Sequence, residues 1–298
     1  MDKLLILDGN SVLHRAYYAL PDWRNRSGEA TAGVYGFLSM TLKAMEELKP
    51  THLIVVFDHP SPTFRHTMYV GYQTNREKDR QVSEDIWGQV DKLQLVLEKM
   101  GIPVFQISGF EADDIIGTIS THATKFSSVI IVTGDRDMMQ LVNKKINLYM
   151  PLKGLTDAML VDSGKVKERM GVDPNQIIDY KGLVGDGSDN YPGVAGIGPK
   201  TATGLLAEYK SLENIYKNLS KLSVAVTKKL AEGHQGAILS QQLATIKRDV
   251  PLSVDWNKAV VPTSETMAAV FKELGHKSLI KRVGGKEDED STNPRLFE

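Results

Sequence analysis

The stretch Leu4-Leu5-Ile6-Leu7-Asp8-Gly9-Asn10 is an apolar run that ends abruptly in a carboxylate and a glycine. A short run that is apolar at every position is typical of a strand buried on both faces, as in a parallel sheet covered by helices. Asp8 then stands at the carboxyl end of the strand, the edge where open α/β sheets hold their ligands. This stretch therefore predicts an α/β fold with a polar site at one edge of the sheet.

The rest of the N-terminal half repeats this alternation of short apolar runs and amphipathic stretches. Strands are expected at residues 3–8, 51–58, 103–108, 129–133 and 146–150. Helices are expected between them, at residues 31–48, 82–100 and 111–125. This order favours a mostly parallel five-stranded sheet flanked by helices on both faces.

From about residue 161 the pattern becomes helical, with helices expected at 198–210, 235–248 and 263–274. Asp173, directly before Pro174, is expected to cap a further helix rather than to belong to a site. We divide the chain into a core at 1–160, a helical subdomain at 161–283 and a hydrophilic tail or linker at 284–298, which is expected to be disordered.

The composition excludes several classes of protein. The chain has 298 residues and no cysteine, which rules out disulfides, thiolate zinc sites and cysteine nucleophiles and suits a reducing cytoplasm. No apolar run reaches the roughly 18 residues of a membrane span, and the N-terminus lacks a signal-peptide pattern. We therefore expect no membrane partner.

Acidic residues follow four of the expected strands. Because the carboxyl ends of parallel strands meet at one edge, these side chains are expected to converge. The acids that follow the strands are Asp8, Asp58, Glu111, Asp113, Asp114, Asp135 and Asp137. Glu111 and Asp114 are three residues apart, which places them on one face of a helix that begins there. Asp186 and Asp189 have the same spacing, on a helix or across a loop.

Carboxylates gathered in this way repel one another unless cations neutralise them. Sites made only of oxygen favour Mg²⁺, Mn²⁺ or Ca²⁺ over zinc, and no EF-hand spacing is present. Two such ions about 4 Å apart can activate a water and stabilise the leaving oxygen of a phosphoryl transfer. A haloacid-dehalogenase-type phosphatase is disfavoured, because Asn10 stands where it would need a second aspartate.

The net charge of −1 hides an uneven distribution. With nine carboxylates assigned to one site, 28 acidic residues remain against 36 basic ones, as in a protein with an acidic pocket in a basic surface. The polar stretch 59–83 adds basic and aromatic side chains, among them Arg65, Arg76 and Tyr72. It is either a solvated loop or a cover over the sheet edge that suits phosphates and unstacked bases.

A glycine-rich segment, Pro192 to Ala202, lies between two helical patterns. Amides at the start of the following helix can bind a phosphate, with Lys200 adding positive charge. The Gly196-Ile197-Gly198-Pro199-Lys200 segment is therefore either a clamp for the DNA backbone or a tight turn between helices. The spacing of a Walker loop is absent.

Seven motifs in order resemble the flap endonuclease family, in the form of the 5′-nuclease domains of bacterial DNA polymerase I. They are Leu-Asp-Gly-Asn at 7–10, Phe-Asp at 57–58, Phe-Arg at 64–65, Glu-Ala-Asp-Asp at 111–114, Thr-Gly-Asp-Arg-Asp at 133–137, Gly-Asp-Gly-Ser-Asp-Asn at 185–190 and Gly-Ile-Gly-Pro-Lys-Thr-Ala at 196–202. The resemblance covers roughly residues 1–283. It implies a PIN-like α/β core, a helical arch at about 59–92 and a helix–three-turn–helix clamp for duplex DNA.

The resemblance also implies an activity and partners. It implies Mg²⁺-dependent hydrolysis of DNA at 5′ flaps and 5′ ends, in Okazaki-fragment processing and repair, with two ions per site and Mn²⁺ as a substitute. The partners implied are branched or 5′-flapped DNA and a polymerase portion in the same or a separate chain. We expect a monomer in the bacterial cytoplasm, associated with the nucleoid.

Residue roles carry over by position in the motifs. The first ion is assigned Asp8, Asp58, Glu111, Asp113 and Asp114. The second ion is assigned Asp137, Asp186 and Asp189, with Asp135 shared. Arg15 and Asp135 are the catalytic candidates, and Arg15 matches a residue that places the scissile phosphate. The DNA contacts are assigned to Arg15, Arg65, Tyr72, Gln73, Arg76, Gly196, Gly198, Lys200 and Thr201. A potassium ion is expected on backbone carbonyls at 193–198.

One residue departs from the family pattern. The family usually has lysine after the arch tyrosine, and here Gln73 follows Tyr72. The lost charge would have helped to stabilise the reacting phosphate, a role for which Arg76 and Lys78 are the substitutes available. Two alternatives therefore stay open: a non-catalytic module that binds branched DNA, and a PIN-type ribonuclease, although such ribonucleases lack the glycine clamp.

Overall fold

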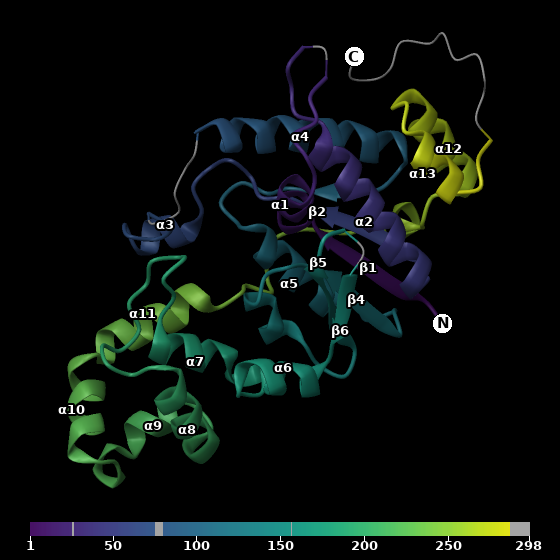
Figure 1. Ribbon diagram of the computed structural model, residues 1–298. Helices are drawn as coiled ribbons and strands as arrows, with labels where there is room; N and C mark the ends of the chain where they lie inside the picture. Colours follow the sequence, from purple (N-terminus) through teal and green to yellow (C-terminus); the bar gives the residue numbers. More distant parts are fainter. Residues whose placement is uncertain (26, 75–79, 156, 287–298) are drawn as a thin grey trace.

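A computed structural model describes residues 1–25, 27–74, 80–155 and 157–286. Its centre is a six-stranded sheet in the order β3-β2-β1-β4-β5-β6 (Figure 1). The strands are β1 (Lys3–Asp8), β2 (His52–Val56), β3 (Val104–Phe105), β4 (Ser128–Val132), β5 (Ile146–Lys153) and β6 (Asp157–Val161). Neighbouring strands are parallel except β5 and β6, which pair antiparallel. The α/β prediction is confirmed, with β6 as a sixth strand that it did not include.

The central strand β1 explains the opening sequence. Leu5 pairs with Leu53 of β2 on one side and with Ile130 of β4 on the other. Successive side chains of a strand point to opposite faces, so Leu4 packs in one hydrophobic core and Leu5 in the other. Both faces of β1 are therefore dry, and this is why its apolar run is uninterrupted.

Helices cover both faces of the sheet. On the Leu5 face lie α1 (Gly9–Ala19), α2 (Ala32–Leu48) and α4 (Arg80–Lys99). On the Leu4 face lies α5 (Ala112–His122), together with the short η1 (Asp137–Leu141). All of these helices bury apolar residues against the sheet. Because β1 to β5 are parallel, their carboxyl ends lie at a common edge, and the loops that follow them gather there.

The second half of the chain is helical, as expected. It contains α6 (Ser163–Met170), α7 (Ile177–Val184), α8 (Pro199–Tyr209), α9 (Leu212–Lys217), α10 (Val224–Glu232) and α11 (His234–Ala244). Short turns of 3₁₀ helix lie at η2 (Pro174–Gln176), η3 (Leu219–Lys221) and η4 (Trp256–Ala259). Asp173 caps η2 through a capping box with Gln176, so its predicted role as a cap is confirmed.

The last two helices pack apart from the other helices of residues 161–283. The helices α12 (Ser264–Glu273) and α13 (Lys277–Arg282) return to the N-terminal core, where Phe271 and Leu279 are buried in the cluster that contains Leu5. Figure 1 shows them in yellow beside α2, far from α8, α9 and α10. Arg282 fixes the contact by donating to the carbonyl and hydroxyl oxygens of Ser39, at 3.1 and 2.8 Å.

The expected arch is described in part. It begins with α3 (Phe64–Met68), and it ends on α4, which packs against α1 and α2. Residues 75–79, among them Arg76 and Lys78, lie outside the described residues. Within the described residues, no helix is both long enough and apolar enough to pass through a membrane.

Candidate active site

Asp8 lies where β1 ends and α1 begins, and its side chain is 4% exposed. Its Oδ1 accepts the backbone N–H of Ser11 at 3.0 Å, and its Oδ2 accepts the Thr133 hydroxyl at 2.7 Å. The carboxylate thus joins the ends of β1 and β4. Burial raises the pKa of Asp8 to about 7 against these hydrogen bonds, and Asp58 and Asp135 add to the rise.

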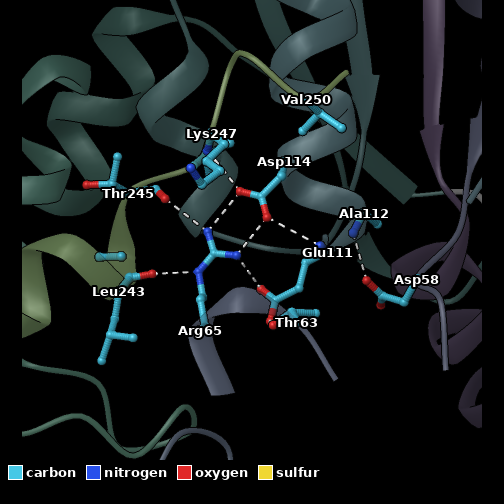
Figure 2. A network of polar contacts seen from close by, with 12 residues as sticks. Asp58, Thr63, Arg65, Glu111, Ala112, Asp114, Leu243, Thr245, Lys247 and Val250 are labelled. Carbon is cyan, nitrogen blue, oxygen red and sulfur yellow. Dashed lines mark hydrogen bonds and ion pairs between the residues drawn. The ribbon is translucent and has the colours of Figure 1, made fainter. Parts of the chain in front are cut away.

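Asp58 follows β2 and is held from two sides. Its backbone N–H donates to Asn10 Oδ1, and its Oδ1 accepts the N–H of Ala112 at the start of α5, both at 2.8 Å. The second contact is visible in Figure 2. Asn10, the last residue of the Leu-Asp-Gly-Asn motif, is therefore a positioning residue for Asp58.

Two acids of α5 and its cap complete this group. Burial raises the pKa of Glu111 to about 7, and Asp58 is one of the charges that add to the rise. Burial also raises the pKa of Asp113 well above its usual range, helped by Asp135, Asp8, Glu111 and Asp58. Acids from four separate segments therefore act on one another electrostatically at the carboxyl edge of the sheet.

The turn after β4 brings in the next two acids. The Thr133 hydroxyl accepts the N–H of Asp135 at 2.9 Å, and Asp135 Oδ1 accepts the N–H of Asp137 at 2.8 Å. Burial raises the pKa of Asp137 to about 6, although Lys181 lowers it. Asp135 acts on Asp8 and Asp113 on one side and on Asp137 on the other, a position that suits a shared ligand.

Asp186 and Asp189 lie in a loop, which decides between the two arrangements that their spacing allowed. Asp186 Oδ1 accepts the N–H groups of Ser188 and Asp189, at 2.7 and 3.1 Å, and this closes a turn after α7. The loop begins at Gly185, whose φ of 73° favours glycine. It returns through Tyr191, which exchanges backbone hydrogen bonds with Asp186.

Lys181 is a site residue that sequence reasoning missed. It lies on α7, where its ammonium forms ion pairs with Asp137 Oδ1, at 2.6 Å, and with Asp186 Oδ2. Burial lowers the pKa of Lys181, but the two acids outweigh it and raise the pKa above its usual range. The only signal in the sequence was one basic residue in an otherwise mostly apolar helix, five residues before Asp186.

Asp114 is placed differently from the expectation. It is 0% exposed, and Arg65 binds both of its oxygens, with Nη1–Oδ2 at 2.7 Å and Nη2–Oδ1 at 2.9 Å (Figure 2). The N–H of Lys247 also donates to Oδ1, at 2.8 Å. Asp114 is therefore saturated by its own chain and is not available to an ion in this structure.

Arg65, which was assigned to DNA, is likewise engaged by its own chain. A guanidinium has five N–H donors, and all five are engaged. Besides the two bonds to Asp114, Arg65 donates to Glu111 Oε2 at 3.0 Å and to the carbonyl oxygens of Leu243 and Thr245, at 2.8 and 2.9 Å. It is 2% exposed, so it ties α3, α5 and the end of α11 together rather than facing a DNA phosphate.

The arch base, which contains Tyr72 and Gln73, lies against the acids. Tyr72 is 4% exposed, packs with Tyr191 and Leu243, and its hydroxyl lies 3.1 Å from Glu111 Oε2 and 3.5 Å from Asp189 Oδ2. Its ring is therefore covered here rather than presented to a base. Gln73, at a φ of 57°, donates its N–H to the carbonyl of Asp189 at 2.9 Å.

Asn190 completes the contact between the arch base and the second acidic loop. Its side-chain amide donates to the carbonyl of Gly71 and to the Thr74 hydroxyl, both at 2.8 Å. With the Gln73 contact, these bonds fix the loop that carries Asp186 and Asp189 to the start of the arch.

Arg15 and the expected clamp residues are held by local contacts of their own. The Arg15 guanidinium donates to the carbonyls of Pro151 and Leu152 at the end of β5, at 2.9 and 3.2 Å. Gly198 caps α8, with Pro199 in its first turn, so the amides of Lys200 and Thr201 lie at a helix start as expected. The Gly196 carbonyl, within the expected potassium site, accepts the Lys229 ammonium at 3.0 Å.

The donor set fits hard divalent cations, because every side chain offered is a carboxylate. Burial, with a smaller contribution from neighbouring acids, raises the pKa values of Asp8, Glu111 and Asp137 to about 7, 7 and 6, so their charged forms are disfavoured without a cation. Among the described residues, no three acidic or histidine side chains are already closed around one point. The acids are instead held by their own hydrogen bonds and by the cations Arg65 and Lys181.

Comparison with known families defines the class of protein. Residues 3–171 match the family described as 5′-3′ exonuclease, N-terminal resolvase-like domain, and residues 172–266 match its counterpart, described as 5′-3′ exonuclease, C-terminal SAM fold. The chain therefore belongs to the 5′-3′ exonuclease family and is a hydrolytic nuclease. The family match confirms the resemblance found in the sequence.

Relatives of this chain include bacterial DNA polymerases. The chain is 39% identical to DNA polymerase I of Caldicellulosiruptor bescii, over 96% of this chain and 34% of the relative. It is 38% identical to DNA polymerase I of Bacillus subtilis, over 95% of this chain and 32% of the relative. The chain thus spans about a third of the length of these relatives.

A solved structure supports the fold. The bacteriophage T5 D15 flap endonuclease, crystallised with DNA and metal ions, is similar with a TM-score of 0.68 and 18% sequence identity. The likeness covers 95% of this chain and 97% of that chain. At this identity it shows a shared architecture.

Proposed function

We propose that this chain hydrolyses DNA phosphodiesters at 5′ flaps and 5′ ends, in Okazaki-fragment processing and in repair. One observation carries the proposal: five acids from four segments act on one another electrostatically at the carboxyl edge of the sheet. They are Asp8, Asp58, Glu111, Asp113 and Asp135. A cluster of this kind is costly to a fold unless it binds cations. Bacterial relatives favour a cytoplasmic location at the nucleoid and a polymerase portion as the partner, and we expect the chain to act as a monomer.

The proposed ligands of the first ion are Asp8, Asp58, Glu111 and Asp113. The proposed ligands of the second are Asp137, Asp186 and Asp189, and Asp135 is shared between the two. Asp114 is now proposed to act through Arg65 and Glu111 rather than as a ligand. Mg²⁺ is the proposed ion, with Mn²⁺ as a substitute, and the ions would supply an activated water and a stabilised leaving oxygen.

Other residues of the chain would place the substrate. The exposed start of α8 offers the amides of Lys200 and Thr201 and the Lys200 ammonium to the duplex backbone, independent of base sequence. Gly196 and Gly198 keep that approach free of side chains. Arg15, near the acid edge, is proposed to contact the scissile phosphate after it leaves the carbonyls of β5.

The arch residues need a change of state to take part. Tyr72 is proposed to leave its pocket and stack on a base near the cut, with Gln73 beside it. Potassium at 193–198 is also retained as a proposal, and it requires Lys229 to release the Gly196 carbonyl. Both movements are expected to depend on bound DNA.

A cleavage assay tests the function directly. Labelled 5′-flap DNA, the matched single-stranded DNA and the same flap made of RNA are each incubated with Mg²⁺ or with a chelator. Cleavage of flap DNA at the branch, with Mg²⁺ only, supports the proposal. Binding without cleavage would mean a branched-DNA binding module, and cleavage confined to RNA would mean a PIN-type ribonuclease.

A further inference from the structure

The last turn of α7 places a lysine between two proposed ligands of the second ion. Lys181 Nζ lies 2.6 Å from Asp137 Oδ1 and also forms an ion pair with Asp186 Oδ2. Its side chain is 11% exposed. A buried ammonium in such a position is a local positive charge between two carboxylates that come from separate segments of the chain.

The two carboxylate oxygens of Asp186 have different partners. Its Oδ1 already accepts the N–H and the hydroxyl of Ser188 and the N–H of Asp189, at 2.7, 2.5 and 3.1 Å. The oxygen left to face the site is Oδ2, and Lys181 holds it. An ion that binds Asp186 through this oxygen therefore competes with the ammonium for it and is repelled by its charge.

The cation beside the first group of acids is placed differently. Arg65 donates to Glu111 Oε2 at 3.0 Å, but Asp114 and the carbonyls of Leu243 and Thr245 hold its other N–H groups. Lys181 instead pairs with two proposed ligands of the second ion. The two halves of the site are thus unequal in the protein itself.

From this geometry we propose that Lys181 is a built-in competitor for the second divalent ion. Its ammonium occupies the position of that ion until an ion displaces it, and this competition weakens the second site relative to the first. The inference rests on the proposed assignment of Asp137 and Asp186 as ligands of the second ion. It predicts ordered loading, with the first ion bound at concentrations that leave the second position to the lysine.

The test measures metal affinity without catalysis. Binding of Mn²⁺ to the DNA-free protein is followed by electron paramagnetic resonance of the free ion, for the wild type, Lys181→Met, Lys181→Arg and Lys167→Met. Removing a charge in direct contact with two ligands should tighten the weaker site by about tenfold or more, and leave the tighter site unchanged. Lys181→Arg keeps the charge and should keep the weak site.

Lys167→Met is the matched control. Lys167 lies on α6 and forms an ion pair with Asp173 at 3.1 Å. Its replacement by methionine changes the net charge by the same amount without touching the acid cluster. It should bind both ions as the wild type does. A tightening of the same size in Lys167→Met and Lys181→Met would mean a general effect of net charge and would overturn the inference.

A second measurement uses the wild type alone, so that it does not depend on how Lys181→Met folds. Reductive methylation followed by peptide mass spectrometry reports how accessible each lysine is. Saturating Mg²⁺ should raise the modification of Lys181 several-fold and leave Lys167 unchanged. If two ions bind while Lys181 stays protected, the inference fails and the two-ion function stands. If no second ion binds to any variant, the ligand assignment and the inference fail together.

Discussion

Arg65 and Asp114 form a two-pronged ion pair in the interior, with donor–acceptor distances of 2.7 and 2.9 Å and side chains that are 3% and 0% exposed. Asp113, the residue before Asp114, lies near the other acids of the site instead. Two adjacent aspartates of one motif therefore have opposite surroundings, one satisfied by a cation of the protein and one surrounded by like charges.

This contrast gives the first prediction. Asp114→Asn should lower the free energy of unfolding by about 3 kcal/mol or more, because it leaves the Arg65 charge buried without its partner. Asp113→Asn should instead leave stability unchanged or raise it, and should weaken Mn²⁺ binding. Urea denaturation and Mn²⁺ titration of both variants check this. A loss of metal affinity in Asp114→Asn with unaltered stability would return Asp114 to the ligands.

Asp135 gives the second prediction, because it lies between the two groups of acids. Asp135→Asn should abolish flap cleavage and spare flap binding measured in Ca²⁺, since it removes a charge shared by both ions. Asp173→Asn is the control, because asparagine also serves as a helix cap. Turnover of Asp135→Asn at the wild-type rate would remove it from the site.

Gln73 gives the third prediction. Its backbone is held by Asp189 at the edge of the acid cluster, so a lysine side chain there would add positive charge near the reacting phosphate. Gln73→Lys should raise the single-turnover cleavage rate, and Gln73→Met, which is similar in size and uncharged, should not. An unchanged or lower rate for Gln73→Lys would show that charge at this position does not reach the phosphate.

Lys200 gives the fourth prediction. Lys200→Ala should weaken binding to duplex DNA of any sequence and reduce the slope of log affinity against log salt by about 1, as expected for one lost phosphate contact. Lys165→Ala, on α6 and paired with Glu168, is the control. Fluorescence anisotropy at several salt concentrations measures both, and an unaltered slope would mean that Lys200 does not touch phosphate.

The raised pKa values give the fifth prediction, with a definite sign. In metal-free protein the pKa values of Asp8 and Glu111 are raised to about 7, so the folded state holds protons that the unfolded chain releases near pH 4. Stability from this source is present in acid and is lost as the pH rises through about 7. The Tm in chelator should therefore fall from pH 5.5 to 8, and Mg²⁺ should raise Tm more at pH 8 than at pH 6. A Tm gain from Mg²⁺ that is independent of pH would contradict it.

The sequence predicted the parts of this molecule that depend on local pattern. The apolar run before Asp8 and the runs before Asp58 and Asp135 are strands, and parallel pairing brings their ends to one edge. Spacing alone placed Glu111 and Asp114 on one face of α5 but could not show what faces them. Their partner, Arg65, is 49 residues from Asp114 in the chain.

The contacts that the sequence could not supply are all long-range. Lys181 meets Asp137 only because α7 packs against η1, and Tyr72 meets Asp189 only because the arch base folds onto a loop 117 residues away. The strand β6 was missed because it is short and half-exposed, so its pattern is weak. The return of α12 and α13 to α2 likewise follows from no local signal.

Two glycines near the acids have a consequence for where a duplex would be cut. A Cβ atom on Gly185 would lie 2.5 Å from the Tyr191 oxygen and 2.7 Å from the Gly193 nitrogen, so the two backbone segments touch. Val194 adds a hydrogen bond to the carbonyl of Leu183 at 2.8 Å. The loop that carries Asp186 and Asp189 and the segment that leads to the start of α8 are thereby held together as one short unit. If α8 grips the DNA backbone as proposed, this connection would set the number of nucleotides between the gripped backbone and the severed bond.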